Sequence, residues 1–175
     1  MELEQALALI RAVPDFPHQG ILFQDITPLL SNPDAFRALI RALGQIDPKA
    51  QSVVAIEARG FILGAALANH RSIGFVPVRK KGKLPCETFQ EGYSLEYGDD
   101  CLEIHRDALT VRSQVLLIDD VLATGGTINA AIKLIDQAGG NVSTVAVLIE
   151  ILALGGRERI LAQNPNIIIE SLLAI

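Results

Sequence analysis

Near the amino terminus, apolar residues recur at the spacing of a helix. An amphipathic helix is predicted over residues 3–13, because one of its faces would carry Leu3, Ala6, Leu7, Ile10 and Val13. Pro14 is expected to end this helix, and a loop marked by proline and glycine follows over 14–20. Asn32 and Pro33 have the pattern of an N-cap followed by proline at the first helical position, which predicts a second helix to about Gly44.

From residue 52 onward, short apolar runs alternate with helical patterns. Strands are predicted over 52–57, 73–79, 114–120 and 142–150, and helices over 60–70 and 126–138. This alternation is typical of an α/β fold in which a parallel sheet carries helices on both faces. The sequence contains no internal repeat, low-complexity tract or dividing linker, so a single domain over 1–175 is predicted.

The alternation breaks between Lys80 and Arg112. This stretch is polar and is interrupted by Gly82, Pro85, Gly92 and Gly98. Short segments within it, such as 102–105, are compatible with a hairpin. Because long irregular insertions in compact domains usually serve function, we expect this one to contribute to a site.

The composition narrows the class of protein. Half of the residues are hydrophobic and 20% are charged, which supplies a sizeable core. A net charge of −5 without a long basic tract disfavours binding to nucleic acid or to a membrane surface. No apolar run has the length of a membrane span, and the acidic amino terminus is unlike a signal peptide. Cys86 and Cys101 lack metal-ligand spacing and are expected to be free thiols in the cytoplasm.

The segment 115–127, VLLIDDVLATGGT, places two acids beside an anion-binding loop. Asp119 and Asp120 end a buried apolar run, at the end of a predicted strand where open α/β sheets bind ligands. The glycine-rich residues 123–127 lead into a helix, and their free N–H groups favour an anion. Since carboxylates repel anions, the ligand must separate them with neutral hydroxyl groups or a metal. A sugar phosphate does this, with its phosphate in the loop and its ribose hydroxyls on the acids.

Four other interpretations explain this segment less well. No lysine follows the glycines, so the loop is not a P-loop, and no G-x-G-x-x-G fingerprint is present. A phosphorylated-aspartate receiver domain also has acids at strand ends, but T-G-G-T does not follow them. A plain helix N-cap loop with solvated acids explains a D-D pair alone better than it explains the whole thirteen-residue pattern.

The segment resembles the phosphoribosyl pyrophosphate (PRPP) motif of the type I phosphoribosyltransferases. Further stretches resemble the adenine-specific branch of that family: PDFPHQGILFQDITPLL (14–30), IEARGFILG (56–64), VRKKGKLPCETFQEGYSLEYG (78–98) and IEILALGGRERIL (149–161). The resemblance covers essentially the whole chain in family order. It implies a type I phosphoribosyltransferase-like fold with a small N-terminal hood, and a homodimer. The implied reaction is the purine-salvage conversion of adenine and PRPP into AMP and pyrophosphate, with Mg²⁺ as cofactor.

The resemblance also assigns the residues that bind PRPP. Asp119 and Asp120 are expected to hold the ribose hydroxyls. The 5′-phosphate is expected in a loop made of Ala123, Thr124, Gly125, Gly126 and Thr127. Mg²⁺ is held mainly by PRPP, with the two acids as candidate ligands. The resemblance further implies a cis peptide at Glu57–Ala58, but we assign Glu57 itself no role.

Basic residues are expected to compensate the charge of the leaving pyrophosphate. Arg59 follows a predicted strand and opens a helix, so it can point at this group. Arg79, Lys80 and Lys83 belong to a basic cluster that also follows a strand, in an otherwise acidic protein. Arg59 and Lys80 are the candidate catalytic residues of this set.

The base is expected to lie against apolar side chains. Phe23, in a loop flanked by glycine and proline, should stack on the purine, with Val121 and Leu122 on its opposite face. Backbone groups around Leu22 and Gln24 should read its Watson–Crick edge.

The loop 81–98 is expected to close over the reactants. Its Glu96 matches the family glutamate that contacts N7 of the base and is the candidate general acid or base. Tyr97 should help the loop exclude water.

Two alternatives remain open. A 6-oxopurine (hypoxanthine, guanine or xanthine) phosphoribosyltransferase usually has E-D before the loop and a nearby lysine, whereas this chain has D-D followed by Val121 and Leu122. A non-catalytic PRPP-sensing regulator usually adds a nucleic-acid-binding module, for which 175 residues leave little room.

Overall fold

A computed structural model describes residues 1–95 and 98–175. The chain divides into two compact units, residues 1–45 and residues 46–175. None of the described helices has the length and apolar character needed to cross a membrane.

The first unit contains a small hairpin and three helices. Its elements are α1 (Leu3–Leu7), β1 (Arg11–Pro14), β2 (Leu22–Asp25), α2 (Thr27–Ser31) and α3 (Pro33–Gln45). The predicted second helix is confirmed as α3. The Asn32 side chain accepts hydrogen bonds from the backbone N–H groups of Asp34 (3.0 Å) and Ala35 (3.1 Å), as an N-cap does.

The predicted helix over 3–13 is wrong beyond Leu7. Residues 11–14 instead form β1, which pairs antiparallel with β2 from Arg11↔Asp25 to Pro14↔Leu22. A short isolated helix is only marginally stable, whereas the hairpin gives the same backbone groups a partner strand. The ion pair between Arg11 and Asp25, at 2.6 Å, adds to this pairing.

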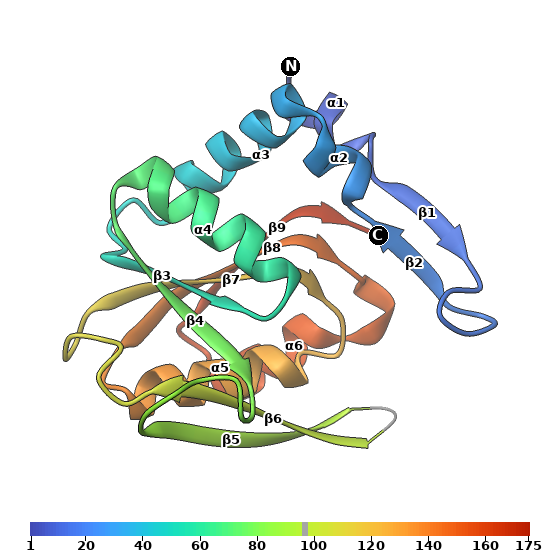
Figure 1. Ribbon diagram of the computed structural model, residues 1–175. Coiled ribbons are helices and arrows are strands. Elements are labelled where there is room, and N and C mark those ends of the chain that lie inside the picture. Colours follow the sequence, from blue (N-terminus) through green and yellow to red (C-terminus); the bar gives the residue numbers. More distant parts are fainter. Residues whose placement is uncertain (96–97) are drawn as a thin grey trace. The chain divides into compact units, whose positions relative to one another are not determined.

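The second unit is built on a seven-stranded sheet (Figure 1). Its strands are β3 (Ser52–Ile56), β4 (Gly74–Lys80), β5 (Thr88–Leu95), β6 (Gly98–His105), β7 (Gln114–Leu122), β8 (Asn141–Glu150) and β9 (Ile168–Ala174). Their order is β5-β6-β4-β3-β7-β8-β9, and the five from β4 to β9 in this order are mutually parallel. The four predicted strands and the predominantly parallel sheet are therefore confirmed.

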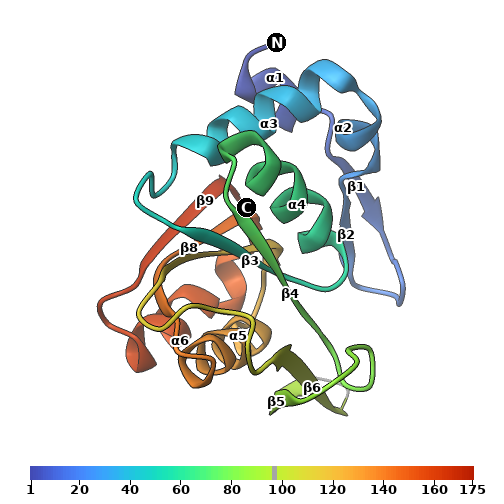
Figure 2. The same ribbon diagram turned by 60° about the vertical axis from the view of Figure 1, so that its left-hand side comes forward.

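Helices cover both faces of this sheet, as predicted. Figure 1 and Figure 2 show α4 (Arg59–Arg71) on one face, and α5 (Gly126–Gln137) with α6 (Gly156–Gln163) on the other. The α4 helix lies so close to the sheet that a Cβ added at Gly64 would be 2.5 Å from the Cβ of Ala55. Buried aliphatic side chains of β3, β7, β8 and α5 form the core.

The insertion between Lys80 and Arg112 is more regular than we expected. Most of it forms an antiparallel hairpin, in which β5 and β6 pair from Thr88↔His105 to Leu95↔Gly98. The β6 strand also pairs antiparallel with β4, so the hairpin extends the sheet at its edge. The sequence does not show the alternation of apolar and polar residues that is typical of strands, because polar residues such as Glu103 are buried in this hairpin.

Candidate active site

Among the described residues of the second unit, those predicted to bind ligand lie mainly at the carboxyl ends of β3, β4 and β7. The β3 strand lies between the other two, and the chain leaves β3 toward β4 but leaves β7 toward β8. The ends of β3 and β7 therefore flank a topological switch point, where open α/β sheets form a ligand crevice.

Asp119 and Asp120 occupy the end of β7 and are largely buried, at 9% and 7% exposure. The Asp120 backbone N–H donates to Asp119 Oδ1 at 2.9 Å. Burial, and then the neighbouring charge of Asp120, raises the pKa of Asp119 well above its usual range. Burial also raises the pKa of Asp120, and the charge of Arg59 offsets part of this effect. The pair is thus largely shielded from water.

Arg59, which follows β3 in the chain, contacts this pair of carboxylates. It is the first residue of α4, and its Nε lies 2.7 Å from Asp120 Oδ2. The preceding Glu57–Ala58 peptide is cis, as the resemblance implies. The start of α4 also packs against the end of β7, because a Cβ added at Gly60 would lie 3.0 Å from Asp119 Oδ1. The structure thereby brings Arg59 and the two acids together.

The predicted anion loop follows β7 directly. Gly125, which directly precedes α5, has a φ angle of +79°. This is a left-handed backbone conformation that glycine adopts without strain. The α5 helix begins at Gly126, so the N–H groups of its first turn border the loop. The Thr127 side chain hydrogen-bonds with the phenol of Tyr93, whose own pKa is raised by burial. The β5–β6 hairpin therefore reaches the loop.

The predicted pyrophosphate-binding cations carry carboxylate partners in this structure. Arg79 forms two contacts with the carboxylate of Glu57, at 3.0 and 3.3 Å, and donates to the Lys83 carbonyl at 2.9 Å. Lys80 pairs with Asp100, and this partner raises the pKa of Lys80. Both pairs are partly exposed to solvent, so an incoming polyanion has access to the cations.

Three acids that we did not predict organise this region. Hydrogen bonding from Arg79 lowers the pKa of Glu57, and the Lys80 pairing lowers that of Asp100. Burial opposes ionisation of Glu103, but backbone N–H groups of residues 82–84 outweigh it and lower the pKa. Glu57 follows Ile56 and Glu103 follows Leu102, and both of these apolar residues lie in strands. An acid next to a strand residue was the feature of the sequence that could have indicated these two side chains.

The residues predicted to bind the base are divided between the two units. Leu22, Phe23 and Gln24 lie in β2 rather than in a loop, and the Phe23 ring packs edge-on against Phe16 with centroids 5.1 Å apart. In the second unit, Val121 is half-buried, whereas Leu122 is 1% exposed and belongs to the hydrophobic core. Glu96 and Tyr97 lie outside the described residues.

The described residues suit a Mg²⁺ ion that is held partly by its ligand. In residues 1–95 and 98–175, no three His, Cys, Asp or Glu side chains form a group able to hold a metal ion. Two adjacent carboxylates are nevertheless present, and Mg²⁺ commonly takes one or two such groups while phosphates and water complete its shell. The donor set therefore fits a magnesium ion carried in by a polyphosphate.

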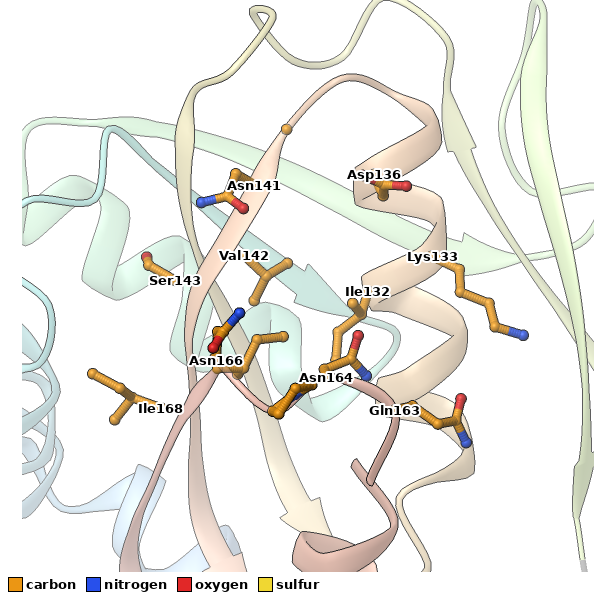
Figure 3. Close-up of a pocket in the computed structure, with 13 residues that line it drawn as sticks. Ile132, Lys133, Asp136, Asn141, Val142, Ser143, Gln163, Asn164, Asn166 and Ile168 are labelled. Carbon is orange, nitrogen blue, oxygen red and sulfur yellow. The ribbon is translucent and has the colours of Figure 1, made fainter. Parts of the chain in front are cut away.

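A separate cavity of about 620 Å³ lies elsewhere on the second unit (Figure 3). Lys133 and Asp136 of α5, Asn141 of β8 and Asn166 of the α6–β9 connection border it. Asn141 pairs with Gln114, the first residue of β7, so the cavity opens at the amino ends of the strands. It contains no predicted site residue and lies at the opposite end of β7 from Asp119 and Asp120.

The chain is similar to known proteins over most of its length. The phosphoribosyl transferase domain family matches residues 25–165. The adenine phosphoribosyltransferase of Prochlorococcus marinus (strain MIT 9303) is 53% identical over 90% of this chain and 92% of its own. The crystal structure of the adenine phosphoribosyltransferase of Thermoanaerobacter pseudethanolicus has a TM-score of 0.91 at 45% identity, covering 99% of both chains. That of the Giardia lamblia enzyme complexed with 9-deazaadenine has a TM-score of 0.92 at 40% identity, covering 100% of this chain and 98% of its own.

Proposed function

Because the chain belongs to the adenine phosphoribosyltransferases of the phosphoribosyl transferase domain family, we propose that it converts adenine and PRPP into AMP and pyrophosphate at this site. The observation that carries the assignment is the buried Asp119–Asp120 pair directly before a glycine loop that opens a helix. This order of groups suits a ribose phosphate, since neutral hydroxyls separate the carboxylates from the phosphate.

PRPP is bound in two parts. The carboxylates of Asp119 and Asp120 accept hydrogen bonds from the ribose 2′- and 3′-hydroxyls. The backbone N–H groups of 123–127, with the hydroxyls of Thr124 and Thr127, surround the 5′-phosphate. When bound, Mg²⁺ would be held mainly by PRPP, with Asp119 and Asp120 as candidate ligands, and it would supply positive charge that offsets the charge of the pyrophosphate.

The bond between C1 of the ribose and pyrophosphate breaks with its electron pair leaving on pyrophosphate, N9 of adenine bonds to C1, and the base gives up a proton that Glu96 accepts at N7. Arg59, Arg79, Lys80 and Lys83 compensate the growing charge of the pyrophosphate. To bind it, Arg79 and Lys80 must exchange their present partners, Glu57 and Asp100, for phosphate oxygens. The sugar passes through an oxocarbenium-like state, and the protein mainly positions groups around it.

Adenine contacts Phe23 on one face and Val121 on the other. Leu122 is part of the core, so we assign it to supporting this surface. Backbone groups of Leu22 and Gln24 read the Watson–Crick edge. Glu96 acts as the acid or base at N7, and Tyr97 helps loop 81–98 to exclude water.

We further propose that the enzyme is a homodimer of the cytoplasm. Cys86 and Cys101 are both free thiols, which suits a reducing compartment. Light scattering after size-exclusion chromatography tests the assembly directly, since a mass of one 18.8 kDa chain would contradict the dimer.

The reaction is tested by offering single bases with PRPP and Mg²⁺. The protein is mixed with adenine, hypoxanthine, guanine or xanthine, and nucleotide formation is followed by chromatography. AMP from adenine alone is the expected result. IMP, GMP or XMP instead would retain the PRPP site but overturn the base pocket of Phe23 and Val121. Tight PRPP binding without any product would favour a sensor.

A further inference from the structure

The tail segment 149–161 has no part in the proposed function, although its motif resembles the family's. It begins at the end of β8, where Glu150 pairs in register with Leu122 at the end of β7. The Ile151 backbone N–H continues this pairing by donating to the Leu122 carbonyl at 2.9 Å. The chain then turns through residues 152–155 and starts α6 at Gly156. This path returns the tail to the loop that follows β7.

The start of α6 touches the anion loop backbone to backbone. A Cβ added at Gly156 would lie 2.2 Å from the carbonyl oxygen of Ala123 and 2.7 Å from Cδ1 of Leu122. In the other direction, a Cβ added at Gly125 would lie 2.8 Å from the carbonyl oxygen of Gly156. No larger residue fits at either position unless the backbone moves, because real Cβ atoms do not approach other atoms this closely.

Arg157 fixes the helix start at this distance. Its guanidinium donates to both carboxylate oxygens of Glu150, at 2.8 and 2.5 Å, and to the carbonyl of Ile169 at 2.8 Å. Glu150 is 3% exposed, so this two-pronged contact is largely shielded from water. One side chain therefore links the start of α6 to the carboxyl end of β8 and to Ile169 near the amino end of β9.

We propose that Gly156 and Arg157 are positioning residues for the 5′-phosphate loop. Gly156 supplies the bare backbone surface on which Ala123 and Gly125 rest, and Arg157 holds that surface in place. The N–H groups of the loop thereby keep the direction in which they meet a phosphate. This inference rests on the proposed assignment of the 5′-phosphate to residues 123–127.

The test compares ligands that do and do not carry a 5′-phosphate. Isothermal titration measures AMP, ribose 5-phosphate and Mg²⁺-pyrophosphate binding to the wild type and to Gly156→Ala. We expect the two ribose phosphates to bind about tenfold to a hundredfold more weakly, and pyrophosphate affinity to stay within about twofold. Gly74→Ala is the matched control, because a Cβ there meets nothing within 4 Å.

Two results would overturn the inference: unchanged ribose phosphate affinity in Gly156→Ala, or an equal loss for all three ligands. If Gly156→Ala does not fold by circular dichroism, Arg157→Lys decides by the same comparison, since lysine keeps the charge but loses the fork. Wild-type protein that binds none of the three ligands would instead refute the proposed function.

Discussion

At the residue scale, Asp119 and Asp120 carry a cost in the folded protein. Burial raises the pKa of both carboxyls, which means that their ionised forms are less stable here than in water. Such a cost is commonly retained at sites where ligand binding compensates it. The same two side chains should therefore weaken the fold and strengthen PRPP binding.

We expect the double variant Asp119→Asn and Asp120→Asn to bind PRPP more weakly and to melt at a higher temperature at pH 7. The amides remove two charged acceptors for the ribose hydroxyls and also remove the charge from the interior. Titration calorimetry and thermal unfolding measure the two effects. Exposed Asp107→Asn serves as the control. Normal PRPP affinity in the double variant would refute the ribose assignment.

Glu96→Gln is expected to lower turnover by about 10²–10⁴-fold while PRPP affinity stays nearly intact. The amide keeps the shape of the side chain but cannot exchange a proton with the base. Steady-state kinetics with PRPP titration separates the two effects. Glu87→Gln, in the same insertion and 85% exposed, is the matched control. An unchanged turnover number would remove Glu96 from the mechanism.

At the element scale, the site depends on how closely α4 lies against the sheet. Gly60 and Gly64 face β7 and β3 with no room for a side chain, so the helix carries Arg59 directly to the acids. The hairpin β5–β6 is held to α5 by the Glu91–Lys133 ion pair at 2.8 Å and by the contact of Tyr93 with Thr127. A helix on one face of the sheet and a hairpin at its edge thus bring groups to one crevice.

Gly64→Ala is expected to destabilise the fold by about 1–3 kcal/mol, because its methyl group must displace α4 from Ala55. Urea unfolding measures this change. Gly74→Ala, at the open start of β4, should differ little from the wild type. Equal stability of both variants would contradict the close approach of α4 to β3.

At the scale of the whole molecule, paired carboxylates set the response to acid. Folding lowers the pKa of a group of acids in both units, namely Asp25 (to about 2), Glu57, Asp100, Glu103 and Glu150. A carboxyl with a lowered folded pKa contributes stability above its unfolded pKa. That contribution disappears as the pH falls through the folded value. The protein should therefore lose stability below about pH 4.5, the ordinary range of these groups.

Glu150→Gln isolates one such contribution. Its carboxylate pairs with Arg157, so the variant should lose about 1–3 kcal/mol of unfolding free energy at pH 7. The difference from the wild type should shrink as the pH falls from the ordinary glutamate pKa through the lowered pKa of folded Glu150, below which the carboxyl is protonated in both the folded and the unfolded state. Urea unfolding at several pH values checks this, and a difference independent of pH would contradict the ion-pair explanation.

Much of the second unit could be predicted from its residues. The apolar run Val115–Ile118 predicts a buried strand, and the glycines at 125–126 predict a turn into a helix. Both features could be predicted because they depend on residues that are neighbours in the chain. Asn32 predicted the start of α3 through local hydrogen bonds alone. The family resemblance of the motifs then indicated a chemistry that the spacing alone left open.

The tertiary structure decided which distant residues meet. Residues 11–14 form a strand instead of the predicted helix, because residues 22–25 pair with them. Lys80 pairs with Asp100, and the backbone of Ala123 packs against Gly156. These residues are far apart in sequence, so the local spacing of apolar and polar residues does not predict their contacts. Local patterns reflect backbone preference and the burial of one face. The partner of a charge or of a bare backbone depends on the path of the whole chain, and only the folded structure contains that path.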